Sequence, residues 1–314
     1  MTKYILRRLA SLIPVLLGAT FIVFAIMHFT PGDPATLMLP QDATTEQIER
    51  MRENLGLNEP FLVQYGNFLF GMLQGNLGPS LRTGQPVTGI IASRLPATMQ
   101  LAAASLLVAV TIGLIAGIIA AVKQYSVWDG GAMFTALLGV SMPNFWLGLM
   151  MILLFAVFWS NTFGYTLFPA SGYGTLRHIV MPAIVLGTAH AAFITRITRS
   201  SMLEVLRQDY VRTARAKGLS EWKVVVVHAL RNALMPVVTI AGLRFGVLLG
   251  GSVVTERIFA WPGIGRLLID AVRAQDYNVV QGIILTYAVI FSLVTLVVDL
   301  LYAFIDPRIR TQYR

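Results

Sequence analysis

The stretch Asp209–Trp222 reads DYVRTARAKGLSEW and lies between two long apolar segments. It places Arg212, Arg215 and Lys217 close together in a chain of which 12% of the residues are charged. Soluble domains carry about 25% charged residues. Three interpretations fit such a basic stretch: a solvated loop, an anchor on a lipid surface, or a docking site for another protein.

The segments on either side are typical of a helical integral membrane protein. Hydrophobic residues make up 56% of the 314 residues, and several apolar runs are long enough to cross a hydrocarbon core of about 30 Å. Helices are favoured because an open sheet would leave backbone groups unpaired in lipid. The absence of cysteine excludes disulfides and thiolate metal sites. The net charge of +9 indicates cytoplasmic loops and not nucleic-acid binding.

The apolar runs predict an all-α integral membrane protein with six transmembrane helices. The predicted spans are Leu9–Phe29, Ala97–Val122, Gly130–Trp159, Ile179–Thr198, Ala233–Thr255 and Val279–Ile305. The third is long enough to tilt or to kink at Pro143. The first follows basic residues, as a signal peptide does, but its length and the absence of a small-residue cleavage site favour an uncleaved helix. A removed signal is the alternative.

Charge predicts the orientation of these spans. The loop 196–231 carries a net charge of +5, whereas the long loop 30–96 carries −2. By the positive-inside rule, both termini and the basic loop are predicted to be cytoplasmic, and the long loop external.

The external loop 30–96 is predicted to be partly helical. PGDPA at Pro31–Ala35 has turn chemistry, and Thr44–Leu57 has the composition of a capped helix that Gly56 can end. Phe61–Leu73 is amphipathic and aromatic, which suits a helix on the bilayer surface or on neighbouring spans.

Motifs of covalent chemistry are missing from the sequence. It has no G-x-x-x-x-G-K-[ST] for ATP phosphates and no G-x-S-x-G nucleophile motif. Its histidines lack the spacing of metal ligands: His28, His178, His190 and His228. No catalytic residue and no metal ligand are predicted.

The basic loop is predicted to contain one helix, Met202–Lys217, which ends at Gly218. One face of this helix combines an aromatic ring, small residues and a cation at spacings i, i+3, i+4 and i+7: Tyr210, Thr213, Ala214 and Lys217. The other side, with Arg212 and Arg215, can hold anionic lipid or a partner's carboxylates. A solvated loop is the plain alternative.

Polar residues within the spans are candidates for lining a path through the membrane. Arg244 lies near the middle of the fifth span, where it either faces a water-filled path or pairs with Asp299 of the sixth. His190, Asn144 and Trp146 are weaker candidates, since such residues in a span are more often packing groups.

Residues Tyr210–Thr239, YVRTARAKGLSEWKVVVVHALRNALMPVVT, resemble the cytoplasmic loop of binding-protein-dependent ABC importer permeases, specifically the dipeptide/oligopeptide branch. The resemblance covers almost the whole chain. It extends to YILRRLASLIPVLLGATFIVFAIMHFTPGDPA, LGLNEPFLVQYGNFLFGMLQGNLGPS, MPAIVLGTAHAAFITRITRSSMLEVL, TERIFAWPGIGRLLIDAV and LVVDLLYAFIDPRIR.

The resemblance implies a type I ABC importer permease fold. It also implies that the basic loop is a coupling helix, which docks in a groove of a separate ATPase subunit. The residues implied in this coupling are Tyr210, Arg212, Thr213, Ala214, Arg215, Ala216, Lys217 and Gly218. The family's E-A-A positions are here Arg212, Thr213 and Ala214, so its acidic residue and first alanine are replaced. Its later I-x-L-P motif is also altered, and both departures are usual for the peptide branch.

The resemblance further implies an assembly in the bacterial inner membrane. Its partners would be a second homologous permease chain, two ATPase subunits, an external solute-binding protein and membrane lipid, with no nucleic acid. ATP and Mg would bind the ATPase subunits, and this chain would bind no cofactor. The chain divides into 1–29 (cytoplasmic N-terminus and first helix), 30–96 (external loop) and 97–314 (permease core, with the coupling loop 199–231).

The implied function is ATP-driven import of di- or oligopeptides. One alternative is another cargo in the same family, such as a nickel complex, glutathione or an opine-like solute. A stand-alone secondary transporter is a further alternative, but such a protein is expected to show a coupling-ion site and inverted repeats, and neither is visible in the sequence.

Overall fold

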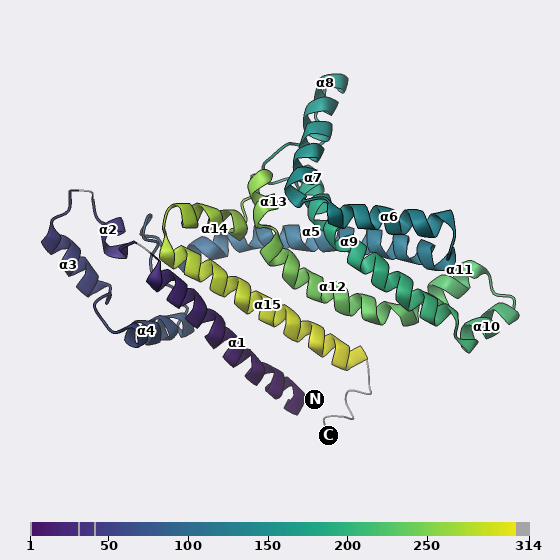
Figure 1. Cartoon of the computed structure of the whole chain (residues 1–314), viewed down its shortest axis with the longest axis horizontal. Helices are drawn as coiled ribbons and strands as arrows, with labels where there is room; N and C mark the ends of the chain where they lie inside the picture. Colours follow the sequence, from purple (N-terminus) through teal and green to yellow (C-terminus); the bar gives the residue numbers. More distant parts are fainter. Residues whose placement is uncertain (1, 31, 41, 306–314) are drawn as a thin grey trace. The chain divides into compact units, whose positions relative to one another are not determined.

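The computed structural model describes residues 2–30, 32–40 and 42–305, and these are helical almost throughout (Figure 1). Six helical segments are long and apolar enough to cross a membrane, which confirms the predicted number. They are Ala10–Phe29, Val87–Val122, Asn144–Phe163, Leu176–Leu206, Glu221–Gly251 and Tyr277–Val298.

The chain packs into two compact units. The first, Met1–Thr98 with Pro262–Leu293, contains α1 (Thr2–Phe29), α2 (Pro34–Met38), α3 (Thr45–Asn54), α4 (Phe61–Leu73) and α14 (Ile264–Arg273). The second, Met99–Trp261 with Val294–Arg314, contains α6 (Val127–Ser141), α7 (Asn144–Met151), the π-helix η1 (Ile152–Phe158), α8 (Trp159–Phe163), α9 (Leu176–Leu206), α10 (Asp209–Ala216), α11 (Glu221–Lys223), the π-helix η2 (Val224–Leu230), α12 (Arg231–Gly251) and α13 (Val253–Ile258). The long helices α5 (Val87–Val122) and α15 (Tyr277–Ile305) contribute to both units.

The predicted third span, Gly130–Trp159, is wrong as a single helix. The chain leaves the helix between α6 and α7, where Met142 has φ −82° and ψ 125°. Pro143 causes this break, because its ring disfavours helical backbone in the residue before it. The apolar span begins only at Asn144 and continues through η1 into α8.

The predicted helix in the first half of the long loop is confirmed as α3. Its N-terminus is a capping box: the Thr44 hydroxyl accepts from the Gln47 N–H at 3.3 Å, and the Gln47 side chain accepts from the Thr44 N–H at 2.9 Å. This exchange satisfies two backbone donors that a helix start leaves unpaired. Gly56 follows the helix with φ +66°, a conformation that favours glycine.

The aromatic segment Phe61–Leu73 forms α4 with the predicted bounds, and it packs on the neighbouring span α1. Phe24 of α1 is buried among the rings of Phe61, Tyr65 and Phe68, at centroid distances of 5.4 to 5.5 Å. Such ring pairs contribute beyond their buried area because their edges and faces carry opposite partial charge. The sequence allows this helix to lie on the bilayer surface or on neighbouring spans, and in the structure it packs on the span α1.

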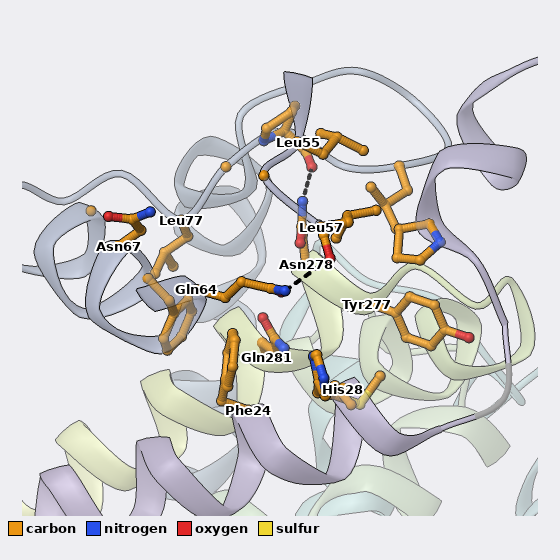
Figure 2. Close-up of a pocket in the computed structure, with 18 of the residues that line it drawn as sticks. Phe24, His28, Leu55, Leu57, Gln64, Asn67, Leu77, Tyr277, Asn278 and Gln281 are labelled. Carbon is orange, nitrogen blue, oxygen red and sulfur yellow. Dashed lines mark hydrogen bonds between the residues drawn. The ribbon is translucent and has the colours of Figure 1, made fainter. Parts of the chain in front are cut away.

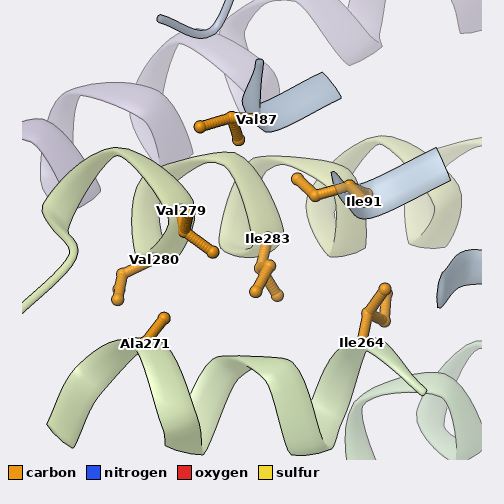
Figure 3. Packing of buried hydrophobic residues seen from close by; sticks show 7 residues of the cluster. All are labelled: Val87, Ile91, Ile264, Ala271, Val279, Val280 and Ile283. Carbon is orange, nitrogen blue, oxygen red and sulfur yellow. The ribbon is translucent and has the colours of Figure 1, made fainter. Parts of the chain in front are cut away.

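The core of the first unit joins the start of α5 to α14 and α15 (Figure 3). Its buried members are Val87, Ile91, Ile264, Ala271, Val279, Val280 and Ile283. The nearby buried carboxylate of Asp276 accepts from the Leu81 N–H at 3.1 Å and from the Ser80 hydroxyl. The end of the long loop is thereby fixed to the start of α15.

The second unit is built around α9, which packs against α6 and α12. Glycines allow α5 to approach α9 closely: a Cβ on Gly117 would lie 2.8 Å from the Thr195 carbonyl oxygen, and one on Gly113 would lie 2.5 Å from the Ile194 side chain. Small residues at such contacts let two membrane helices gain dispersion contacts along their backbones.

Candidate functional site

The basic loop is not one helix, which corrects the predicted segment Met202–Lys217. Helix α9 ends at Leu206, and α10 starts at Asp209. Between them Gln208 has φ −73° and ψ 149°, so the chain turns before α10 begins. The predicted end is confirmed, since Gly218 follows α10 with φ +77°.

One face of α10 anchors the loop to the rest of the unit. Val211 and Ala214 are buried with Val224 of η2, and Val205 and Leu206 of α9 pack against them. Ala214 is 6% exposed, so its small side chain serves packing within the chain. The expectation that Ala214 offers a surface to a partner is therefore wrong.

The outer face of α10 and the turn after it are exposed. We define the loop surface as the exposed residues Thr213, Ala216, Lys217, Gly218, Leu219 and Trp222. Figure 1 shows α10 and α11 together beyond the C-terminal end of α9. Trp222 is 74% exposed, which is unusual for so large an aromatic side chain. The loop thus exposes small residues, one cation and one indole, while the buried face of α10 packs against the rest of the unit.

The other predicted loop residues have partners within the chain. The Arg215 guanidinium donates to Glu221 at 2.8 Å and 3.4 Å, and Arg212 lies 3.5 Å from Asp209. The Tyr210 hydroxyl accepts a 2.7 Å hydrogen bond from Asn232 of α12. These contacts stabilise the loop, and the pair Arg215–Glu221 leaves Arg215 less available to an outside carboxylate.

The polar candidates within the spans fall into two groups. Arg244 of α12 places its guanidinium carbon 3.7 Å from the ring centroid of Phe193 in α9, a cation–π contact. His190 lies one turn before Phe193, and its Nδ1 is buried without a hydrogen-bond partner in the described part of the chain. Asn144 and Trp146 lie on α7 instead, and Trp146 is exposed. The Asp299 side chain, the alternative partner of Arg244, lies outside the described residues.

An ion pair fixes the start of α6 to α9. Asp129 is 6% exposed and accepts from Arg199 at 2.8 Å and 2.7 Å, and from the Tyr125 N–H at 3.0 Å. The Arg199 hydrogen bonds hold the pKa of Asp129 below its ordinary value of 3.8. Arg199 belongs to the predicted loop 199–231, so the loop's first residue is tied to the neighbouring helix.

Asp129→Asn is expected to lower the free energy of unfolding by about 2 kcal/mol, because it leaves Arg199 without its charged partner. Because folding lowers the pKa of Asp129, its contribution is complete above about pH 4 and is lost as the pH falls further. The difference in thermal stability between wild type and variant should hold from pH 7 to pH 5 and shrink below pH 4. Thermal unfolding of the purified protein in detergent measures it. Asp209→Asn, at an exposed carboxylate, is the matched control, and an equal effect there would contradict the prediction.

Comparison with known proteins places this arrangement in a family. A family model described as the binding-protein-dependent transport system inner membrane component matches residues 113–311, and its N-terminal counterpart matches residues 1–102. The chain belongs to this family of transport permeases.

Curated relatives match the permease along its length. It is 46% identical to the dipeptide transport system permease protein DppB of Alkalihalophilus pseudofirmus and 47% identical to the di/tripeptide transport system permease protein DppB of Pseudomonas aeruginosa. Both matches cover 99% of this chain and 100% of the relative. The DppB protein of Escherichia coli K12 is 43% identical, with 99% of each chain covered.

A solved structure shares the fold of the permease. A chain of the inward-facing MetNI methionine ABC transporter aligns with a TM-score of 0.57 at 18% identity, over 69% of this chain and 96% of that chain. The predicted type I ABC importer permease fold is confirmed by this likeness together with the six apolar helices. The permease is a multi-pass membrane protein.

Several residues that shape the loop surface were not singled out from the sequence. Glu221, Trp222 and Asn232 follow the predicted helix, and each contacts or extends it. The sequence does indicate that Trp222 is exposed, because it stands between the charged residues Glu221 and Lys223. It gives no indication of the role of Asn232, because the contact with Tyr210 depends on how α12 folds back beside α10.

Proposed function

We propose that this permease is a transmembrane subunit of an ATP-driven ABC importer that translocates di- or oligopeptides. Its near full-length identity of 43 to 47% with proteins named as dipeptide or di/tripeptide permeases carries this proposal. Another cargo, such as a nickel complex, glutathione or an opine-like solute, is the alternative within the family.

The loop surface is the proposed docking site for an ATPase subunit. Thr213, Ala216 and Gly218 are exposed and small, so another protein's side chains can approach the backbone there. Val211 and Ala214 hold the helix in place from behind, which lets force on α10 reach α9 and η2. ATP and Mg would bind the ATPase subunits, and the permease itself would move solute without covalent chemistry.

The complete transporter would contain a second permease chain, two ATPase subunits and an external solute-binding protein. The charge distribution supports cytoplasmic termini and an external loop 30–96. In the proposed assembly, in a bacterial inner membrane, residues 97–314 would be the core and loop 199–231 the coupling loop. Arg244, with His190 one turn from its Phe193 contact, is the proposed polar group of the path. Asn144 and Trp146 remain candidates on α7.

Peptide uptake by the assembled transporter tests the function. Proteoliposomes with ATP inside are expected to accumulate radiolabelled dialanine when the binding protein is present outside. Removing ATP while keeping an ion gradient should reduce uptake at least tenfold, since ATP and not the gradient would drive the proposed transport. Full uptake without ATP would support a secondary transporter, and uptake of a nickel complex or glutathione in place of dialanine would assign the other cargo.

A further inference from the structure

A cavity of about 690 Å³ lies within the first unit (Figure 2). Its walls come from the end of α1, the segments around α2 and α3, α4, the stretch before α5, and the first turns of α15. Cavities of roughly 300 to 1,000 Å³ hold small ligands in proteins. None of the coupling-loop or path candidates lines it.

The polar lining of this cavity is mostly uncharged. Its side-chain amides include Asn54, Gln64, Asn67, Asn76, Asn278 and Gln281. Of the charged residues in the wall, Asp33 and Arg52 pair with each other at 2.8 Å. A zwitterionic or uncharged ligand suits this lining, because amides interact with dipoles and the Asp33–Arg52 pair has no net charge.

The cavity contains an amide that lacks a partner. Gln281 of α15 is 9% exposed, and its side chain makes no hydrogen bond to any described residue. Figure 2 shows the Gln281 amide in the cavity, between the Phe24 ring and the Gln64 side chain. Solvent reaches the Gln281 amide atoms in the cavity, so a ligand that donates and accepts hydrogen bonds can replace water there.

Two other cavity amides donate to backbone carbonyl oxygens and keep their acceptors. Gln64 donates through Nε2 to the carbonyl oxygens of Leu57 and Glu59, at 3.0 Å and 2.8 Å. Asn278 donates through Nδ2 to the Pro79 carbonyl oxygen at 2.8 Å. Their carbonyl oxygens remain for N–H groups, one Nδ2 hydrogen of Asn278 remains for a C=O group, and Gln281 offers both a donor and an acceptor. This combination matches the alternating N–H and C=O groups of a peptide main chain.

We propose that this cavity binds a short free peptide through its main chain, at the outer ends of α1 and α15. Phe24 and Phe68 give the cavity apolar walls for peptide side chains, which accept many sequences because they make no directional contact. This proposal rests on the proposed peptide-import function and on the membrane orientation in which loop 30–96 is external. The cavity would hold the peptide on the external side of the membrane after the binding protein releases it.

The absence of cysteine allows a direct binding measurement. Asn67→Cys puts a unique thiol in the cavity wall of the full chain, reconstituted with its partner subunits in nanodiscs. Trialanine is expected to slow maleimide labelling of this thiol at least fivefold. Adding Gln281→Leu should raise the trialanine concentration needed for half protection about tenfold, because the variant keeps the size but removes the amide. If that variant accumulates poorly, Gln281→Met serves instead.

Matched controls separate binding from general effects. Gln74→Leu, at an exposed glutamine outside the cavity, should leave protection unchanged, and Glu46→Cys on exposed α3 should label at the same rate with and without trialanine. Unprotected labelling of Asn67→Cys, or equal protection in Gln281→Leu, would overturn the proposal. So would equal protection by the peptide-free binding protein alone, since the occupant would then be a segment of that protein.

ATP-driven dialanine uptake by the same preparation distinguishes the two proposals. Uptake without protection of the Asn67→Cys thiol rejects the cavity as a peptide site and leaves the import function standing. Loss of uptake in the wild-type assembly rejects the import function itself.

Discussion

Ala216→Trp is expected to reduce ATP-driven uptake by more than tenfold while the protein remains inserted in normal amount. Ala216 is exposed at the end of α10, so an indole there can project away from the described part of the permease. On the proposed docking surface, the same indole would keep an ATPase subunit from approaching the helix backbone. Inserting extra side-chain atoms into a packed contact is unfavourable by about 1 to 3 kcal/mol. An indole between α10 and the ATPase subunit is expected to weaken docking by at least that much.

Two measurements on Ala216→Trp test this expectation together. Uptake of radiolabelled dialanine into proteoliposomes reports coupling, and co-purification of the ATPase subunits with the permease reports docking. Glu46→Trp is the matched control, because Glu46 is exposed on α3 and lies far outside the loop surface along the chain. Normal uptake in Ala216→Trp would show that the outer face of α10 makes no functional contact.

The structure also shows why Ala216 is a sharper test than its neighbours. Ala214 is buried against Val211 and Val224, so a tryptophan there would displace the loop's own packing. Gly218 has φ +77°, so any side chain there strains the backbone whatever the partner does. Only a position that is exposed and ordinarily helical separates docking from folding.

Gly117→Leu is expected to prevent stable packing of α5 on α9 and to lower the amount of folded protein severalfold. The first added carbon alone would lie 2.5 Å from the Thr198 side chain and 2.8 Å from the Thr195 carbonyl oxygen. The carbonyl belongs to the α9 backbone, so relief requires moving a whole helix. A cost of about 3 kcal/mol or more is a large share of the stability of most domains.

Gly89→Leu provides the control for this prediction on the same helix. Gly89 lies in α5 as well, but a Cβ there meets no atom within 4 Å. Fluorescence-detected size-exclusion chromatography of both variants measures the folded fraction after extraction in detergent. Equal recovery of Gly117→Leu and Gly89→Leu would contradict the close α5–α9 contact.

Local sequence was sufficient for features that depend on neighbouring residues. The capped helix after Thr44, the aromatic helix Phe61–Leu73 and the glycine end of α10 each arise from side chains within a few positions of one another. The break at Met142–Pro143 is also local, because a residue before proline is disfavoured in the helical region. The sequence predicts a kink at Pro143, and the structure has a full interruption of the helix there.

The sequence by itself determined the class of the protein, the number of its apolar spans and the position of its basic loop. These follow from composition and spacing, because lipid requires helices of a minimum length and charge collects on one side. The tertiary structure decided which loop residues are buried and which amides line the cavity. Ala214 and Ala216 look alike in RTARAKG, but α10 turns one toward Val224 and the other outward. Gln281 and Gln64 lie far apart in the chain, and only folding places both in the wall of one cavity.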